Sequence, residues 1–111
     1  MTPLKLAQRQ LEAYNARDLA RFVACYSETV RVFRPPAPGP AIVGMAAFSE
    51  FYATQRFNRP ALHAELVNRI AFGNKVIDHE RISSVAAEPY DIAVVYEVVD
   101  GLIQSTWAYA A

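Results

Sequence analysis

The sequence has a single cysteine, few glycines and no excess of charge of either sign. Cys25 stands alone among 111 residues, so no internal disulfide can form and nothing requires an oxidising compartment. Eleven basic residues balance eleven acidic ones, which leaves no electrostatic footprint for nucleic acid or an anionic membrane surface. We therefore expect a cytoplasmic protein with no nucleic-acid or membrane partner.

Long apolar runs, glycine motifs and histidine clusters are also missing. No run approaches the length of a signal-peptide core or a membrane span. The four glycines form neither a phosphate-cradling loop nor a dinucleotide-binding fingerprint. The two histidines, His63 and His79, do not readily build a typical zinc site, so we expect no metal and no cofactor.

The chain is long enough for one domain, residues 1–111, with a real core. Apolar residues recur at three- and four-residue steps from Leu4 to Tyr14, which predicts a helix. Asp18 is placed to cap a second, short helix. A strand at about 29–34 and a stiff proline-rich loop should follow, and a third helix should begin after Gly44.

The second half predicts strands, and the turn signal Gly73-Asn74 sets a register for the first two. Counting back from it pairs Arg69 with Asp78, Asn68 with His79, and Leu66 with Arg81. Two opposite charges at directly paired positions are typical of a solvent-exposed face, so Arg69 and Asp78 are assigned to the outside of the sheet. The face expected to look inward then carries Leu66, Asn68, Ile70, Ile77, His79 and Arg81.

The second turn signal, Asp100-Gly101, joins the last two predicted strands. Counting from it pairs Tyr96 with Ser105 and Val94 with Trp107, so one face is large and aromatic. The opposite face is flat and mixed, and we expect it to pair with a second copy of the chain in a homodimer. That face carries Ala93, Val95, Glu97, Gln104, Thr106 and Ala108.

Three helices laid on one face of a curved antiparallel sheet would give an α+β cone with an apolar interior. If the helices leave the cone open, it forms a pocket for a small apolar cyclic or carbonyl-bearing ligand. The alternative is a cone filled by the protein's own aromatic side chains.

Three segments carry a family resemblance: the turn Tyr14-Asn15-Ala16-Arg17-Asp18-Leu19, the strand 76–82 and the hairpin 96–103. Together they resemble the SnoaL-like branch of the nuclear-transport-factor-2-like (NTF2-like) superfamily. The resemblance implies a cone-shaped NTF2-like, or cystatin-like, fold over nearly the whole chain. It implies no single reaction, because members include ketosteroid isomerases, epoxide hydrolases, polyketide cyclases and non-enzymatic binders.

The known chemistries of this family lose essential groups here. Ketosteroid isomerases use an Asp base and an oxyanion hole made of a Tyr and a protonated Asp. The resemblance places these three on Arg34, Gln10 and Val94, respectively, none of which can take the role.

The epoxide hydrolases offer a second comparison, through the strand Glu80-Arg81-Ile82-Ser83. Their site pairs two aspartates with an arginine. Arg81 matches the arginine, whereas the aspartates fall on Ser83 and near Ala108. A carboxylate pair able to activate water is therefore not matched.

His79 and Arg81 are our candidates for chemistry. His79 would act as general acid and base, and Arg81 would stabilise an enolate-like oxygen. The alternatives are a hydrogen-bonded core histidine and an arginine paired with a carboxylate. The residues expected to contact the ligand are Tyr14, Tyr26, Arg34, Asn68, Tyr96 and Trp107. A non-catalytic binder and a dimeric interaction module remain as alternatives.

Overall fold

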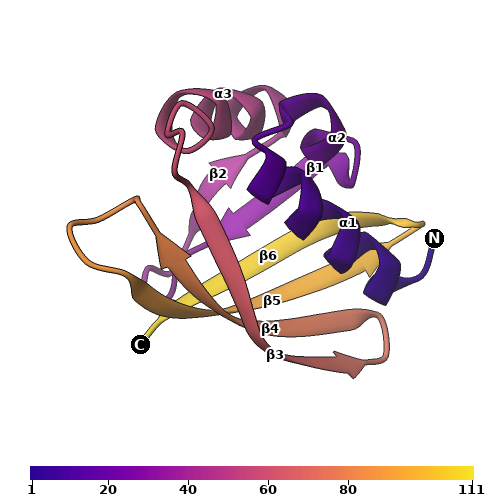
Figure 1. The fold of residues 1–111 in the computed structure, drawn as a ribbon. Helices are drawn as coiled ribbons and strands as arrows, with labels where there is room; N and C mark the ends of the chain where they lie inside the picture. Colours follow the sequence, from indigo (N-terminus) through magenta and orange to yellow (C-terminus); the bar gives the residue numbers. More distant parts are fainter.

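The computed structural model describes residues 1–111 as three helices and six strands. The helices are α1 (Pro3–Ala16), α2 (Leu19–Val23) and α3 (Met45–Gln55). The strands are β1 (Tyr26–Phe33), β2 (Pro40–Val43), β3 (His63–Phe72), β4 (Lys75–Ser83), β5 (Tyr90–Val99) and β6 (Leu102–Ala110). Figure 1 shows the helices on one side of a strongly curved sheet. The predicted α+β cone is confirmed.

Local signals begin and end the first two helices. Thr2 caps α1 by accepting a hydrogen bond from the backbone N–H of Lys5 at 3.2 Å. Arg17, in the left-handed conformation at φ 53°, ends the helix. Asp18 then caps α2 by accepting from the N–H of Arg21 at 3.1 Å, as the sequence predicted. None of the helices is both long and apolar enough to cross a membrane.

The strands lie in the order β2-β1-β6-β5-β4-β3, so β3 to β6 form the expected antiparallel meander. Two features were not expected. β1 pairs with β6 in parallel, and a short strand β2 closes the edge beyond it. β2 was taken for loop because Pro40 begins it. A proline is tolerated there, since the first residue of an edge strand needs no ladder hydrogen bond.

Both tight turns set the register beside them as predicted: Phe72 opposes Lys75, Arg69 opposes Asp78, and Val99 opposes Leu102. Further from each turn, a β-bulge shifts the pairing by one residue. The bulge in β3 comes between Leu66 and Asn68, so Leu66 opposes Glu80 and not Arg81.

The bulge in the last hairpin has the larger effect. Glu97 opposes Ser105 while Val98 opposes Ile103, which leaves one extra residue on β6. The predicted pairs of Tyr96 and Val94 are therefore wrong, and the actual partners are Thr106 and Ala108.

The predicted inner and outer faces of β4 are reversed. Val76, Asp78, Glu80 and Ile82 are buried toward the helices, whereas His79 is half-buried and Arg81 is exposed on the other face. The Arg69–Asp78 pair forms as predicted, but Asp78 is fully buried. Two guanidinium bonds of 2.7 and 2.9 Å satisfy it, and Gln8 on α1 accepts a third from Arg69 at 2.8 Å. An ion pair so completely bonded can be buried under a helix.

Aromatic side chains pack the closed end of the cone between the helices and β1. Phe22 and Phe48 stack with ring centroids 5.7 Å apart, and Tyr26 lies 4.5 Å from Phe48. All three are buried. This aromatic cluster holds α2 and α3 against the sheet. It does not fill the space in front of Tyr26, which other residues line.

Candidate functional site

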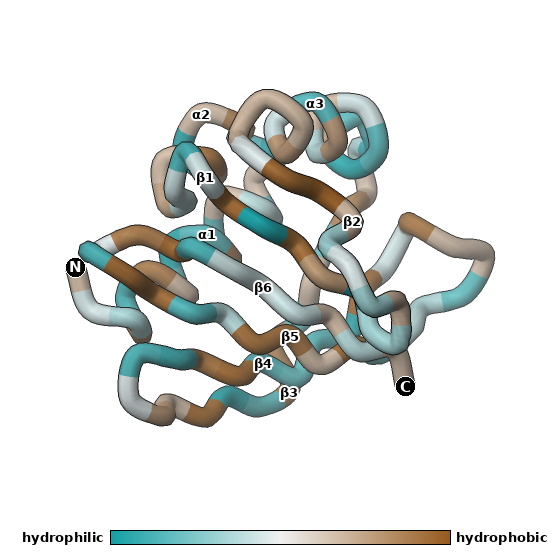
Figure 2. Tube along the Cα trace, turned by 180° about the vertical axis from the view of Figure 1, so that it is seen from behind, coloured by the Kyte–Doolittle hydropathy of each residue, from teal (hydrophilic) through white to brown (hydrophobic).

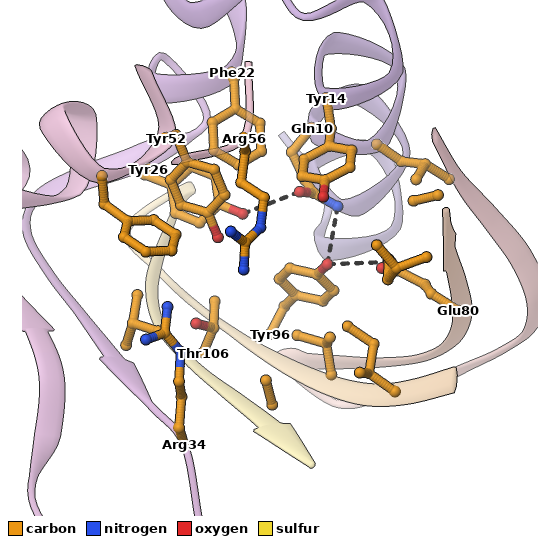
Figure 3. Close-up of a pocket in the computed structure, with 18 of the residues that line it drawn as sticks. Gln10, Tyr14, Phe22, Tyr26, Arg34, Tyr52, Arg56, Glu80, Tyr96 and Thr106 are labelled. Carbon is orange, nitrogen blue, oxygen red and sulfur yellow. Dashed lines mark hydrogen bonds between the residues drawn. The ribbon is translucent and has the colours of Figure 1, made fainter. Parts of the chain in front are cut away.

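A cavity of about 280 Å³ lies between the helices and the concave face of the sheet. Fifteen of its 21 lining residues are hydrophobic, so its walls suit a mostly apolar molecule. Figure 3 shows polar groups from both halves of the chain facing this space. The lining residues that bear polar groups are Gln10, Tyr14, Tyr26, Arg34, Tyr52, Arg56, Glu80, Tyr90, Tyr96 and Thr106.

Four of the residues predicted to contact a ligand line this cavity: Tyr14, Tyr26, Arg34 and Tyr96. They come from α1, β1, the loop after β1 and β5. Asn15 fixes the end of α1 that carries Tyr14, because its amide bonds both the C=O and the N–H of Ala64 on β3, at 3.0 and 2.8 Å. Whether these side chains contact a ligand stays a prediction.

His79 and Arg81 do not reach the cavity, so their predicted place inside the cone is wrong. Both are held by Asp91 on β5: His79 Nε2 lies 2.7 Å from Oδ2, and Arg81 Nε lies 2.9 Å from Oδ1. These bonds, first from Arg81 and then from His79, lower the pKa of Asp91. Arg81 is thus paired with a carboxylate, which was the alternative to a catalytic arginine.

Asn68 and Trp107 also lie outside the cavity. Asn68 opposes His79 on the outer face, and its side chain accepts a hydrogen bond from the backbone N–H of Arg69 at 2.9 Å. Trp107 stacks on Phe33 with centroids 5.3 Å apart and ring planes 8° apart. The bulge in the last hairpin is the reason, since it puts Thr106 among the cavity walls in place of Trp107.

Hydrogen bonds link four polar side chains along the cavity wall (Figure 3). Tyr26 Oη lies 3.0 Å from Gln10 Oε1, and Gln10 Nε2 lies 3.1 Å from Tyr96 Oη. Tyr96 Oη in turn lies 3.3 Å from Oε2 of Glu80. Gln10, Tyr26 and Tyr96 are buried, and Glu80 is only 5% exposed.

The backbone carbonyl of Ala7 determines which group donates in each of these hydrogen bonds. Gln10 Nε2 also bonds the C=O of Ala7 at 3.1 Å, and a carbonyl can only accept, so the NH₂ end of the amide must be there. The amide oxygen then accepts from Tyr26, and the second amide hydrogen is donated to Tyr96. The Tyr96 hydroxyl is therefore left to donate to Glu80.

Glu80 combines two opposing influences. Burial, followed by the neighbouring charge of Asp78, raises the pKa of Glu80 from 4.5 to about 7, while the bond from Tyr96 acts to lower it. A carboxyl with a pKa near neutrality can both accept and return a proton. Sequence reasoning missed this residue, although Val76 and Ile82 share its side of the strand and marked that side as buried.

Three tyrosines that line the cavity, Tyr14, Tyr52 and Tyr90, form no side-chain hydrogen bond within the protein. Of these, Tyr14 and Tyr52 lie side by side, with ring centroids 6.4 Å apart. Burial is the main cause that raises the pKa of each phenol above its usual value. Both therefore stay protonated at neutral pH and can donate to an oxygen placed between them and Glu80.

The positions matched to the ketosteroid isomerase site also meet in this cavity. Gln10, Arg34 and Val94 all line it, and so does Ala108, which lies near one of the two positions matched to the epoxide-hydrolase aspartates. The match of Arg81 to the epoxide-hydrolase arginine fails, because Arg81 lies on the outer face. No three metal-binding side chains come together anywhere in the structure.

Structure comparisons place the fold among known ones. An uncharacterized cystatin fold protein from Novosphingobium aromaticivorans superposes with a TM-score of 0.86 at 21% identity, covering 97% of each chain. A putative ketosteroid isomerase from Kribbella flavida gives 0.82 at 23% identity, over 96% of this chain and 76% of that one. TerC, co-crystallized with polyporic acid, gives 0.78 at 14% identity, over 98% and 91%. At these identities the likeness shows the fold alone.

The sequence comparisons agree with the structural ones. No curated protein matches the sequence. The SnoaL-like domain family matches residues 7–106, from within α1 to within β6. The chain therefore belongs to the SnoaL-like domain family, within the NTF2-like fold that its cavity and curved sheet display.

Proposed function

We propose that the cavity binds a small, mostly apolar cyclic molecule bearing a carbonyl, and that Glu80 moves a proton on it in an isomerase- or cyclase-type reaction. The observation that carries this proposal is the Glu80 carboxyl on the cavity wall, bonded through Oε2 to Tyr96. The apolar lining accounts for the body of the ligand. Glu80 replaces His79 and Arg81 as the candidate for acid and base chemistry, because only Glu80 reaches the cavity.

The proposed step is balanced within the ligand and Glu80. The ionised carboxylate takes a proton from the carbon next to the carbonyl, and the electron pair of that C–H bond forms an enolate. The Glu80 carboxylic acid then returns the proton to a different carbon of the same conjugated system. No oxidant, reductant or metal takes part, and the product is an isomer of the substrate.

The enolate oxygen requires hydrogen-bond donors placed in advance. The Tyr14 and Tyr52 hydroxyls supply them, since both face the cavity and neither donates within the protein. Tyr96 instead holds Glu80, and Gln10 holds Tyr96. In this proposal Tyr96 positions the base, and Tyr14 and Tyr52 bind the enolate oxygen.

Hydrogen exchange tests this function directly. A cyclohexenone-type ketone incubated with the protein in D₂O should lose its acidic C–H signals in the NMR spectrum. Glu80→Gln should slow this exchange by roughly a hundred- to ten-thousand-fold, the usual contribution of a general base. His79→Ala is the matched control and should leave it unchanged, because His79 lies on the other face. Equal rates in the parent and Glu80→Gln would refute the role of Glu80.

Non-catalytic binding by the same cavity is the second candidate. The observation in its favour is that Arg34, Gln10 and Val94 occupy the positions matched to the isomerase groups. Binding of the ketone with no exchange above the buffer rate would select this candidate. Failure of any cyclic ketone to bind would contradict both.

We further propose that the chain forms a homodimer through the outer face of the sheet. In Figure 2, seen from behind, the sheet lies in front of α1, so no helix covers this face. An apolar row crosses five neighbouring strands there through directly paired residues. The row consists of Phe33, Trp107, Val95, Ile77 and Ile70.

The surroundings of this row favour a second copy as its occupant. None of the five side chains is buried, and Ile70 is 52% exposed. Charged groups around them already pair with one another, as in Lys75–Glu97 and Arg81–Asp91. A face without net charge gives no attraction to a charged partner and pairs readily with itself. Thr106 and Ala108, predicted for this face, instead turn into the cavity.

A further inference from the structure

Two arginines stand over one aromatic ring among the residues that line the cavity. The guanidinium carbon of Arg34 lies 4.8 Å from the ring centroid of Phe51, and that of Arg56 lies 5.0 Å from the same centroid. Phe51 is on α3, Arg34 follows β1 and Arg56 ends α3. All three residues line the cavity. The ring thus gathers two positive charges at one place on the cavity wall.

Neither arginine has an acidic partner in the protein. The five ion pairs of the structure involve Arg69, Lys75, His79 and Arg81 as cations, and none includes Arg34 or Arg56. Arg56 donates through Nη1 to the backbone C=O of Gln55 at 2.9 Å, which leaves its other N–H groups free. Two unneutralised cations in one place repel each other, so an anion between them would be bound favourably.

The side chains of Arg34 and Arg56 both point into the cavity. Figure 3 shows the two guanidinium groups turned toward the space beside the Tyr52 hydroxyl. Their charges act on the pKa of Tyr52, which both arginines lower against the stronger effect of burial. The Phe51 ring attracts both guanidinium groups but accepts no conventional hydrogen bond from them, so their N–H groups remain available to a carboxylate, which can accept them in pairs.

Glu80 fixes the orientation of such a ligand. It supplies the acidic group of the cavity wall, where it is bonded to Tyr96 and not to either arginine. A ligand carboxylate would be repelled by ionised Glu80 and attracted by the arginines. We propose that the natural ligand is a cyclic carboxylic acid whose carboxylate is held by Arg34 and Arg56 and whose reacting carbon lies beside Glu80. This proposal rests on the proposed function for the reacting carbon and on the arginines alone for the carboxylate.

A matched pair of probes tests it. Naphthoate and naphthamide share a ring system and differ in charge, and their affinities can be measured by calorimetric titration. We expect the parent protein to bind naphthoate about ten-fold or more tightly than naphthamide, as charge-assisted hydrogen bonds predict. Arg34→Met and Arg56→Met should each reduce that preference, because they weaken naphthoate binding more than naphthamide binding. Arg59→Met is the control, because Arg59 is a neighbouring arginine that does not line the cavity.

The outcomes separate this proposal from the proposed function. Equal affinities for the two probes in the parent would overturn carboxylate recognition and leave the apolar cavity and Glu80 standing. A preference that survives in both methionine variants would place the anion elsewhere and also overturn it. Binding of neither probe would overturn both proposals. Should a variant fail to fold, the Nε–H signals of the parent's arginines provide the readout: naphthoate must shift two of them and naphthamide must not.

Discussion

Replacing Glu80 by glutamine should stabilise the protein at alkaline pH and not at acidic pH. Glutamine keeps the size of the side chain, and its carbonyl can still accept from Tyr96. It removes the charge that glutamate carries when ionised and puts an NH₂ group in place of one carboxylate oxygen. The pKa of Glu80 rises from 4.5 to about 7 on folding, chiefly through burial. Each pKa unit corresponds to about 1.4 kcal/mol, so the effect amounts to about 3 kcal/mol.

The sign follows from proton linkage. A raised pKa means that the folded state holds the proton more tightly than the unfolded state, so the parent is most stable when Glu80 is protonated. This stabilisation is complete below pH 4.5, the unfolded value, and is lost as the pH rises through about 7. Glutamine has no proton to lose. Its advantage over the parent should therefore grow across this interval and then stay constant.

Urea unfolding of both proteins at a series of pH values measures this difference. The free energies of unfolding should nearly coincide at the acidic end and differ by about 3 kcal/mol above neutrality. The two histidines and the other titrating groups away from Glu80 are present in both proteins, so their contributions cancel in the comparison. If the difference between the two proteins does not change with pH, the pKa of Glu80 is the same in the folded and the unfolded state. That result would refute the argument that Glu80 is a base with a pKa near neutrality.

Three further outcomes are expected. Val95→Arg places a charge at the centre of the apolar row, and light scattering at micromolar concentration should change from twice the chain mass to the monomer mass; an unchanged dimer would contradict this surface. Asp78→Ala leaves Arg69 without its buried partner and should lower the free energy of unfolding, measured with urea, by roughly 3–5 kcal/mol. A loss of less than about 1 kcal/mol would contradict this. Turnover of an unsaturated ketosteroid, followed by absorbance, should be absent or very slow, because a steroid seated as in the isomerases would meet Arg34, Gln10 and Val94 in place of the base and the donors, while Glu80 lies elsewhere on the cavity wall. One lost oxyanion donor alone costs roughly a hundred- to a thousand-fold. Robust turnover that persists in Glu80→Gln would show that this matching is wrong.

The sequence predicted the elements well because their signals are local. Asp18 caps a helix, Gly73-Asn74 turns a hairpin, and each acts through neighbours a few residues away. The pairing of Arg69 with Asp78 was also correct, since it depends only on the distance from that turn. The SnoaL-like family assignment is confirmed, because it rests on the order of such elements.

The candidate site was predicted less well because its residues depend on which face is buried. An opposed pair of charges was taken as a solvent signal, but α1 covers Arg69 and Asp78 and completes their hydrogen bonds through Gln8. That single inversion moved His79 out of the cavity and brought Glu80 in. Tyr14, Tyr26, Arg34 and Tyr96 escaped the error, since none of them lies on β3 or β4.

The bulge in β6 decides how much empty space the protein contains. Without the bulge, Trp107 and Tyr109 would point toward the helices, and their two large rings would occupy the interior of the cone. With the extra residue, Thr106, Ala108 and Ala110 face inward in their place. Deleting one residue at the bulge should therefore close the cavity without changing the composition of the rest of the strand. The capacity to hold a ligand would then depend on a one-residue difference in strand length, which a comparison of residue types alone does not detect.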